Sequence, residues 1–322
     1  LAFSDSGPHG HHRSRHLESG ASNDTKVSTC GHARNRQWEA DSLTDETTKI
    51  IEALTPLVEK AGKLAREKQR TLSPSDRTYK DDESVVTEAD EMVERFLVER
   101  IARLVPSANL LTEEAEHDYD PKKPLSFAID PIDGTDVYSQ GMPGWCVSVG
   151  LLDTALVPIG GIIYAPRLDI LVAASDDGPV TLNGSPLGAP EPAQPISVRS
   201  NLMVTSRIHK TVDLSGYIGK IRGIGSAALH LIYHLIYPPV IGALEGPGIH
   251  IWDTAAAHAI NRVQGEDLVY LDGRPIDYAP MTGGGPGADV VVSGQPATVH
   301  ALRQMLHRLQ VGPPADTEEL GA

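Results

Sequence analysis

The chain has 322 residues, of which 40% are hydrophobic and 22% are charged. This length and composition suit one large globular domain or two smaller lobes with an apolar core. Its 43 Asp and Glu residues outnumber its 28 Lys and Arg residues, so the net charge is −15, which disfavours a nucleic acid polymer as a partner.

Neither a membrane span nor a disulfide framework is predicted. No run of about 18 or more apolar residues occurs, as a transmembrane helix would require. The two cysteines are Cys30 and Cys146, and this low number suits a reducing compartment. We therefore expect a cytoplasmic protein, although targeting to an organelle by the N-terminal segment stays open.

Residues 1–43 differ from the rest of the chain. The stretch 7–13 is rich in Gly and His and has no apolar period, which predicts a disordered tail. Its histidines show no fixed ligand spacing, so a solvated tail is favoured over a metal site. The acidic residues Asp5, Glu18 and Asp24 disfavour a transit peptide.

Two helices are predicted next. Apolar residues recur at helical spacing from about residue 45 to 64, with Pro56 as an expected kink. The polar stretch 70–84 is predicted to be a loop. A second helix is expected from Thr87, because Thr87-Glu88-Ala89-Asp90 has the form of a capping box, and it should end before Pro106.

Short apolar runs and turn residues then predict strands, followed by further helices. The expected strands are 110–111, 125–129, 146–152, 157–163, 170–174 and 203–206, with a tight turn at Asn183-Gly184. The expected helices are 227–237, 253–263 and 302–309. This alternation favours an α+β or α/β layered fold over a bundle or a sandwich.

The segment Asp130-Pro131-Ile132-Asp133-Gly134-Thr135 carries the strongest chemical signal. Pro131 fixes its φ angle and Gly134 permits a sharp turn, so the two carboxylates can point to one place. Two carboxylates held so close repel each other unless a cation lies between them, and Mg²⁺ prefers such oxygen ligands. A surface turn is the competing interpretation on spacing alone.

Other acidic residues have ordinary interpretations when each is taken alone. Glu113 and Glu114 follow a short apolar run and could be solvated. Asp253 follows Trp252 at the start of a predicted helix, where an Asp is often only a cap. Asp90 could be no more than the acidic member of the capping box.

Taken together, these segments resemble the inositol monophosphatase family. The family patterns are Glu-Glu after a strand, Asp-Pro-(Ile/Leu)-Asp-Gly-(Thr/Ser) and a later Trp-Asp-x-Ala-Ala, and all three occur here in that order. Residues 86–90 also resemble the family's Val-Thr-x-x-Asp, and residues 225–228 its Gly-(Ser/Thr)-Ala-Ala loop. The resemblance covers roughly residues 45–310.

The resemblance implies an α+β fold arranged as a layered αβαβα sandwich, as in inositol monophosphatases and fructose-1,6-bisphosphatases. An N-terminal α+β lobe at residues 44–195 would carry the metal-binding motif. A C-terminal α/β lobe at residues 196–322 would complete the site in the cleft between the lobes. Family members are commonly homodimers, so a homodimer is a possible assembly.

The resemblance also implies a Mg²⁺ site of two or three ions. The residues that would hold the first two ions are Glu113, Asp130, Ile132 (through its carbonyl), Asp133 and Asp253. A weaker third ion would lie near Glu113 and Asp90. The resemblance also implies that lithium inhibits the phosphatase activity.

The catalytic and substrate-binding roles follow from the same resemblance. Thr135, with Asp90 and Glu113, would orient an attacking water, and no covalent phospho-enzyme is needed. The residues expected to contact the phosphorylated substrate are Ile132, Asp133, Gly134, Thr135, Gly225, Ser226, Ala227 and Glu245. Backbone N–H groups at Gly134 and Thr135 would meet the phosphate where a helix is expected to start.

The substrate is less well determined. Residues 143–150 resemble the branch that acts on inositol and sugar phosphates, and the Lys-Glu that typically follows Asp-Gly-Thr in bisphosphate nucleotidases is absent. Asp136 is unusual for the inositol branch, and Thr112 points weakly toward the nucleotidases. Lys80-Asp81-Asp82 lies where the family has a metal-sensitive loop, although a solvated turn is an equal interpretation.

Three hypotheses therefore stand. The first is a Mg²⁺-dependent phosphomonoesterase that acts on a small phosphorylated polyol, such as an inositol monophosphate or a sugar phosphate. The second is a 3′(2′),5′-bisphosphate nucleotidase. The third is a non-catalytic family member that binds metal or phosphate, which the complete set of matched residues disfavours.

Overall fold

The computed structural model describes residues 30–72, 78–79, 85–115 and 118–309. The chain divides into two compact units, Leu1–Ala40 and Asp41–Ala322, and the fold below is that of the second. Residues 1–29, with the N-terminal histidines, and Lys80-Asp81-Asp82 lie outside the described residues. Among the residues described, no helix has both the length and the apolar character that a membrane crossing requires.

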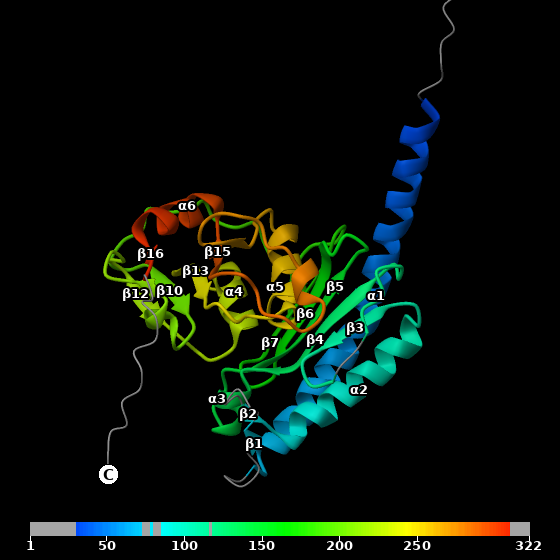
Figure 1. Ribbon diagram of the computed structural model, residues 1–322, viewed down its shortest axis with the longest axis horizontal. Helices are drawn as coiled ribbons and strands as arrows, with labels where there is room; N and C mark the ends of the chain where they lie inside the picture. Colours follow the sequence, from blue (N-terminus) through cyan, green and yellow to red (C-terminus); the bar gives the residue numbers. More distant parts are fainter. Residues whose placement is uncertain (1–29, 73–77, 80–84, 116–117, 310–322) are drawn as a thin grey trace, which may run out of the picture. The chain divides into compact units, whose positions relative to one another are not determined.

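A seven-stranded sheet forms the first half of this unit. In spatial order its strands are β3 (Asn109–Thr112), β4 (Ser126–Asp133), β5 (Cys146–Leu152), β6 (Pro158–Ala165), β7 (Ile170–Ser175), β8 (Thr181–Leu182) and β9 (Ser185–Pro186). Only β3 and β4 run parallel. One face of the sheet packs against α1 (Cys30–Gln69), from Ile50 onward, and against α2 (Glu88–Leu104) (Figure 1).

A five-stranded sheet forms the second half. Its spatial order is β12 (Lys220–Arg222), β10 (Asn201–Val204), β13 (Val240–Glu245), β15 (Val291–Gly294) and β14 (Val269–Tyr270). The helices α4 (Ala227–Ile236) and α5 (Ile251–Val263) lie between the two sheets and share a core with both. The helix α6 (Pro296–Met305) covers the outer face of the second sheet (Figure 1). The layers are therefore αβαβα, which confirms the predicted fold.

Short elements complete the unit. They are α3 (Thr135–Ser139), the hairpin of β1 (Thr78–Tyr79) and β2 (Val85–Val86), the pair of β11 (Val212–Asp213) and β16 (His307–Arg308), and 3₁₀ turns at Ile208–Lys210 and Ala279–Met281. The division into two lobes at residue 195 stays a prediction, because Asp41–Ala322 form one compact unit.

Most predicted elements form where the patterns place them. The capping box at Thr87 is present, and the strand at residues 146–152 has the predicted bounds. Asn183 and Gly184 both have positive φ angles in the β8–β9 turn, as an Asn-Gly hairpin turn requires. The first helix begins earlier than expected, at Cys30, and Pro56 lies inside it.

Three expectations need correction. The last helix spans Pro296–Met305 rather than 302–309, because Pro296 begins it at a position where a missing N–H costs nothing. Residues 70–84 are not all loop, since they contain β1. The strands β13 and β15 were not predicted, although both are interior strands of the second sheet.

The helix α5 approaches the first sheet unusually closely, and glycines make this possible. A Cβ atom on Gly150 would lie 2.6 Å from Ala255 Cβ, and one on Gly161 would lie 2.3 Å from the Ala256 carbonyl oxygen. Small residues on both sides therefore let the helix lie directly on β5 and β6. This contact brings the first turn of α5, with Asp253, toward the end of β4.

Candidate active site

A bulge in β4 brings two carboxylates together. In a regular strand, residues three apart point to opposite faces of the sheet. Here Asp130 pairs with Ser148 and Asp133 pairs with Cys146, so three steps on β4 match two on β5. Because of the extra residue, the side chains of both aspartates lie on the same face of the sheet. Pro131, which has no N–H to donate, lies in the bulge, where proline is tolerated.

Asp133 is held by donors from the start of α4. Its Oδ2 accepts hydrogen bonds from Ser226 Oγ at 2.6 Å and from Ala228 N at 2.7 Å, and its Oδ1 accepts one from Ala227 N at 3.1 Å. Burial and the Asp253 carboxylate raise the pKa of Asp133 to about 7, although these donors favour its charged form. The hydrogen bonds therefore fix the position of the aspartate, while its surroundings disfavour its negative charge.

Asp130 is fully buried and its Oδ1 has no hydrogen-bond partner among the described residues. Burial, followed by the carboxylates of Glu113 and Asp133, raises its pKa well above the usual range. Ligand atoms of Asp130, Asp133 and Asp253 all lie within 4.8 Å of one another. Such a cluster favours a bound cation or a proton, because each carboxylate disfavours the negative charge of the next.

Asp253 reaches the cluster from the first turn of α5. Its Oδ2 accepts a hydrogen bond from His250 N at 2.5 Å, which closes a capping box at the helix start. The His250 ring stacks on Trp252 with centroids 4.9 Å apart. The capping role expected for an aspartate here is thus present, and the same side chain also faces Asp130 and Asp133.

Thr135 links the end of β4 to α2. Its Oγ1 lies 3.1 Å from Asp90 Oδ1 and 2.8 Å from the Ile132 carbonyl oxygen, and it can donate its one proton to either. Asp90 Oδ2 also accepts from Thr87 N and Thr87 Oγ1. Burial raises the pKa of Asp90 to about 6, with the Thr87 hydrogen bonds opposing the rise. Asp90 is therefore both a cap and a partner of Thr135.

Glu113 lies in the loop after β3, half-buried. Its carboxylate is close enough to raise the pKa of Asp130, but it is not in the three-carboxylate cluster of the described residues. The loop is held by buried Glu94 of α2, whose Oε2 accepts from Glu114 N at 2.8 Å. Glu94 was not predicted from the sequence, because a single acidic residue within a helical stripe has no pattern of its own.

Two glycines allow the loops on either side of the site to touch. Gly134 has φ 95° and Gly225 has φ 117°, values that favour glycine. A Cβ atom on Gly225 would lie 2.5 Å from the Val137 methyl carbons, and one on Gly134 would lie 3.3 Å from the Gly225 carbonyl oxygen. The helix α3 begins at Thr135, as predicted, but has only five residues.

A cavity of about 320 Å³ adjoins the carboxylates. Its wall includes Asp133, Asp253, Gly225, Ala227 and Glu245, which are all predicted site residues. Ser226, also predicted to contact substrate, is fully buried and does not line the cavity; its hydroxyl holds Asp133 instead.

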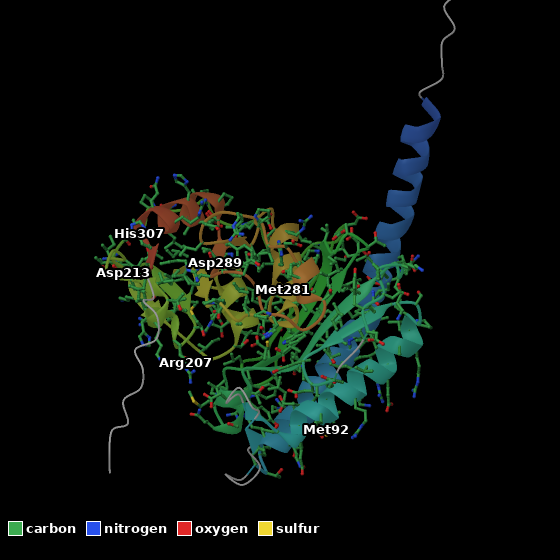
Figure 2. All side chains as sticks on the ribbon, in the orientation of Figure 1. Met92, Arg207, Asp213, Met281, Asp289 and His307 are labelled. Atoms are coloured by element: carbon green, nitrogen blue, oxygen red, sulfur yellow. The ribbon has the colours of Figure 1, made fainter. Side chains whose placement is uncertain are left out.

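The other wall of this cavity was not predicted from the sequence. It comes from Thr205, Ser206 and Arg207, which follow β10, together with Thr211 and the loop 246–249. Figure 2 labels Arg207 in the loop that follows β10. No residue in the described part of the chain forms an ion pair with its guanidinium. An arginine after a short strand carries no local pattern that could have revealed this position.

Glu245 is buried at the end of β13 and forms a pair with His230. His230 Nε2 lies 2.9 Å from Ile224 N and can only accept that hydrogen bond. The proton of the neutral ring is therefore on Nδ1, which donates to Glu245 Oε1 at 2.6 Å. Burial raises the pKa of Glu245, and His230 opposes the rise. The carboxylate is thus oriented before any ligand binds.

Asp136, which complicated the substrate assignment, lies on the surface of α3. Asp136 is exposed, accepts a hydrogen bond from Gln140 Nε2 at 2.9 Å, and does not line the cavity. It is therefore a helix-surface residue rather than a further wall of the site. The Lys80-Asp81-Asp82 segment lies outside the described residues, so its relation to the site stays a prediction.

The residues fit hard divalent cations. A buried Asp130 oxygen has no protein partner, three carboxylates converge, and all the donors are oxygens, which are the ligands of Mg²⁺. The Ile132 carbonyl, also predicted as a ligand, lies beside Thr135 in the same bulge.

Comparisons with known proteins agree with this geometry. The model of the inositol monophosphatase family matches residues 46–304. An inositol-1-monophosphatase of Synechocystis sp. is 34% identical over 210 residues, which cover 61% of this chain and 70% of that protein. The 3′(2′),5′-bisphosphate nucleotidase CysQ of Escherichia coli (strain K12) is 26% identical over 242 residues, which cover 72% of this chain and 94% of that protein. The solved inositol monophosphatase of Anabaena (Nostoc) sp. superposes with a TM-score of 0.62 and 26% identity, covering 81% of this chain and 97% of that one.

Proposed function

The chain belongs to the inositol monophosphatase family of metal-dependent phosphoric monoester hydrolases, and from this premise we propose that it hydrolyses a small phosphorylated polyol with Mg²⁺. The observation that carries the proposal is the convergence of Asp130, Asp133 and Asp253, with a buried Asp130 oxygen that has no partner in the described structure. Two or three Mg²⁺ ions would be held by Asp130, Asp133, Asp253, Glu113 and the Ile132 carbonyl.

Bound Mg²⁺ would supply Lewis-acid stabilisation of the phosphate charge and would lower the pKa of the attacking water. The protein's own part begins with Thr135. Its hydroxyl can donate to Asp90 and accept from a water at the same time. This pair would orient the water for attack on phosphorus, with Glu113 on the same side. The Gly134 and Thr135 N–H groups would meet the phosphate oxygens.

The polyol would occupy the 320 Å³ cavity. Glu245 would accept hydrogen bonds from its hydroxyl groups, because the His230 contact leaves the second carboxylate oxygen available and fixes the orientation. Gly225 and Ala227 would line the same pocket, and Asp133 would face the ester oxygen. Ser226 would act indirectly, through its hydrogen bond to Asp133.

A bisphosphate nucleotide is the second candidate substrate, and Arg207 favours it. A guanidinium in the cavity of a chain with net charge −15 is suited to a second phosphate, which it can bind bidentately. The likeness to the CysQ nucleotidase supports the same reading. The intact ligand set makes a purely non-catalytic role the weakest of the three hypotheses.

The setting of the enzyme is part of the proposal. We expect a homodimer in a reducing compartment such as the cytoplasm, in keeping with the free, buried thiol of Cys146. Light scattering on the purified chain would measure the mass of the assembly. A monomeric mass across micromolar concentrations would contradict the proposed homodimer and would leave the proposed catalytic activity unaffected.

The direct test is phosphate release from inositol 1-phosphate, fructose 1,6-bisphosphate and adenosine 3′,5′-bisphosphate, each with Mg²⁺ present and with Mg²⁺ chelated. We expect release with Mg²⁺ only, and the substrate with the highest kcat/KM identifies the branch. Release that continues undiminished in the chelator would contradict the proposed chemistry. If phosphate release is fastest from the adenosine bisphosphate, the substrate is a bisphosphate nucleotide rather than a phosphorylated polyol.

A further inference from the structure

A second hollow, of about 380 Å³, lies apart from the active cavity and shares no residue with it. Its wall is formed by Arg66 and Arg70 of α1 and by Pro166 and Arg167 in the turn between β6 and β7. Three guanidinium groups thus face one space in a chain whose net charge is −15. Positive charges around one space repel one another, and an anion between them would relieve this repulsion.

Two of the three guanidinium groups, those of Arg66 and Arg167, are hydrogen-bonded to the scaffold and form no ion pair within the described ranges. Arg66 Nη1 donates to the Pro166 carbonyl oxygen at 3.3 Å, and Arg167 Nη1 donates to Gln69 Oε1 at 2.7 Å. Only Arg70 has an ion pair within the described ranges, with exposed Glu67. Each fork keeps further N–H donors, since a guanidinium has five.

One of those donors is buried and has no acceptor. Arg66 Nε is inaccessible to solvent and lacks a hydrogen-bond partner among the residues that the structure describes. An unsatisfied buried donor on a charged group is costly, and a negative charge close to the guanidinium would offset part of that cost. Because Nε is inaccessible, an anion in the hollow would contact the arginines through their other N–H groups and would offset part of their positive charge.

The orientation of Arg167 is built into the fold. Gln69 is buried, and its Nε2 donates to the carbonyl oxygens of Tyr138 at 2.9 Å and Met142 at 3.0 Å. These bonds fix the amide, so that its oxygen faces Arg167. The guanidinium is therefore preorganised, which lowers the entropy lost when a ligand binds.

We propose that this hollow is a binding site for a phosphate-bearing small anion, distinct from the active site. Arginine forks match the oxygens of a phosphate better than lysines do, because they bind in a planar, bidentate way. The volume falls in the range of small-molecule sites, so the ligand is inorganic phosphate or a small organic phosphate. Both present the same oxyanion to Arg66, Arg70 and Arg167.

Equilibrium dialysis of the full chain with radiolabelled inorganic phosphate tests the site, with Mg²⁺ present and with Mg²⁺ chelated. We expect two phosphates per chain with Mg²⁺ and one after chelation, because only the active site depends on the metal. The Arg66→Gln and Arg167→Gln variants should bind the metal-independent phosphate at least about tenfold more weakly. Arg274→Gln, in which an exposed arginine paired with Asp272 is changed, is the matched control and should bind as the wild type does.

Competition with glycerol 2-phosphate separates the two sources of the ligand. If glycerol 2-phosphate displaces the label at a lower concentration than unlabelled inorganic phosphate does, the ligand is an organic phosphate. Absence of metal-independent phosphate in the wild type would overturn the proposal. So would unchanged binding by Arg167→Gln with a changed oligomeric mass, since the arginines would then contact a second chain. Loss of only the metal-dependent phosphate would leave this site standing and would count against the proposed catalytic function alone. Thermal unfolding of each variant shows that it is folded.

Discussion

The two ends of the active cavity are built in different ways. At the carboxylate end, Asp133 accepts three hydrogen bonds from residues 226–228, and Asp130 lies in a bulge of a central strand. At the other end, Arg207 is an exposed residue on the loop after β10, with no ion-pair partner in the part of the chain that the structure describes. The scaffold fixes the carboxylates, whereas no ion pair among the described residues fixes the Arg207 guanidinium.

This difference indicates how the work of the site is divided. The chemistry requires carboxylates held close together against their repulsion, and only buried, multiply bonded positions can do so. Substrate choice requires a few polar groups at a suitable distance, which a loop supplies. Changes at the carboxylate end should therefore affect all substrates equally, whereas changes at Arg207 should affect substrates unequally.

The largest effect is expected from Asp130→Asn. Loss of one charge shared between the cations should lower kcat about a thousandfold for every substrate, because several kcal/mol of transition-state stabilisation are removed. The same change relieves repulsion in the metal-free protein, so its Tm in chelator should rise. Phosphate-release assays and thermal unfolding measure the two effects. A fall in activity confined to one substrate would show that the carboxylate end also selects the substrate.

Ser226→Ala should lower activity between about tenfold and a hundredfold, because residues that hold a metal ligand typically contribute that much. The loss of the 2.6 Å donor should also raise the pKa of Asp133 in the metal-free protein above about 7. Protons would then compete better with Mg²⁺, and the acidic limb of the kcat/KM profile at subsaturating Mg²⁺ should shift to higher pH. Ser293→Ala is the matched control, since this buried hydroxyl has no partner within the described structure. Equal pH profiles for the two variants would show that Ser226 does not act through Asp133.

Arg207→Gln should raise the KM for adenosine 3′,5′-bisphosphate about tenfold, because one charge-assisted contact to the second phosphate is lost. The KM for inositol 1-phosphate should change little. Lys210→Gln, on the same loop but outside the cavity wall, controls for the general loss of positive charge. If Arg207→Gln alters both KM values alike, Arg207 is not a specificity residue.

The smallest effect concerns stability and pH. The folded-state pKa values of Asp133, about 7, and Asp90, about 6, lie above those of an unfolded aspartate. The folded state therefore binds more protons between roughly pH 4 and 7, and the metal-free protein should lose stability as the pH rises through this window. A fall in Tm of several degrees from about pH 5 to pH 7.5 is expected in chelator.

Mg²⁺ should suppress this pH dependence, because the bound cations replace protons as the source of neutralisation. Asp133→Asn should weaken it in the metal-free protein. A metal-free Tm that rises across the same pH range would mean that the carboxylates do not repel one another in the folded chain.

Local patterns predicted the carboxylate end but not the loop end. The Asp-Pro-Ile-Asp segment carries its geometry in consecutive residues, and Asp90 and Asp253 lie in capping positions that a short window shows. The roles of Ser226 and Glu94 depend on contacts between residues 93 and 20 positions apart, respectively. Periodicity does not encode such distances, so these roles became visible only in the fold.

The second sheet shows the same limit. The strands β13 and β15 have four to six residues and lie among Gly and Pro, so their apolar runs gave no period to count. Their place is set by pairing with each other and, for β13, with β10. Arg207 reaches the cavity because of where β10 ends, and that is a property of the sheet rather than of the Thr-Ser-Arg sequence around it.

Mn²⁺ binding shows whether Asp130, Asp133 and Asp253 form a cation site. Manganese prefers the same oxygen ligands as Mg²⁺, and electron paramagnetic resonance distinguishes free from bound ions. Titration of the wild type should show at least two bound Mn²⁺ per chain that Mg²⁺ displaces, and Asp130→Asn should lose the tightest of them. Free Mn²⁺ throughout the titration, or equal binding by Asp130→Asn, would show that these carboxylates do not form a cation site.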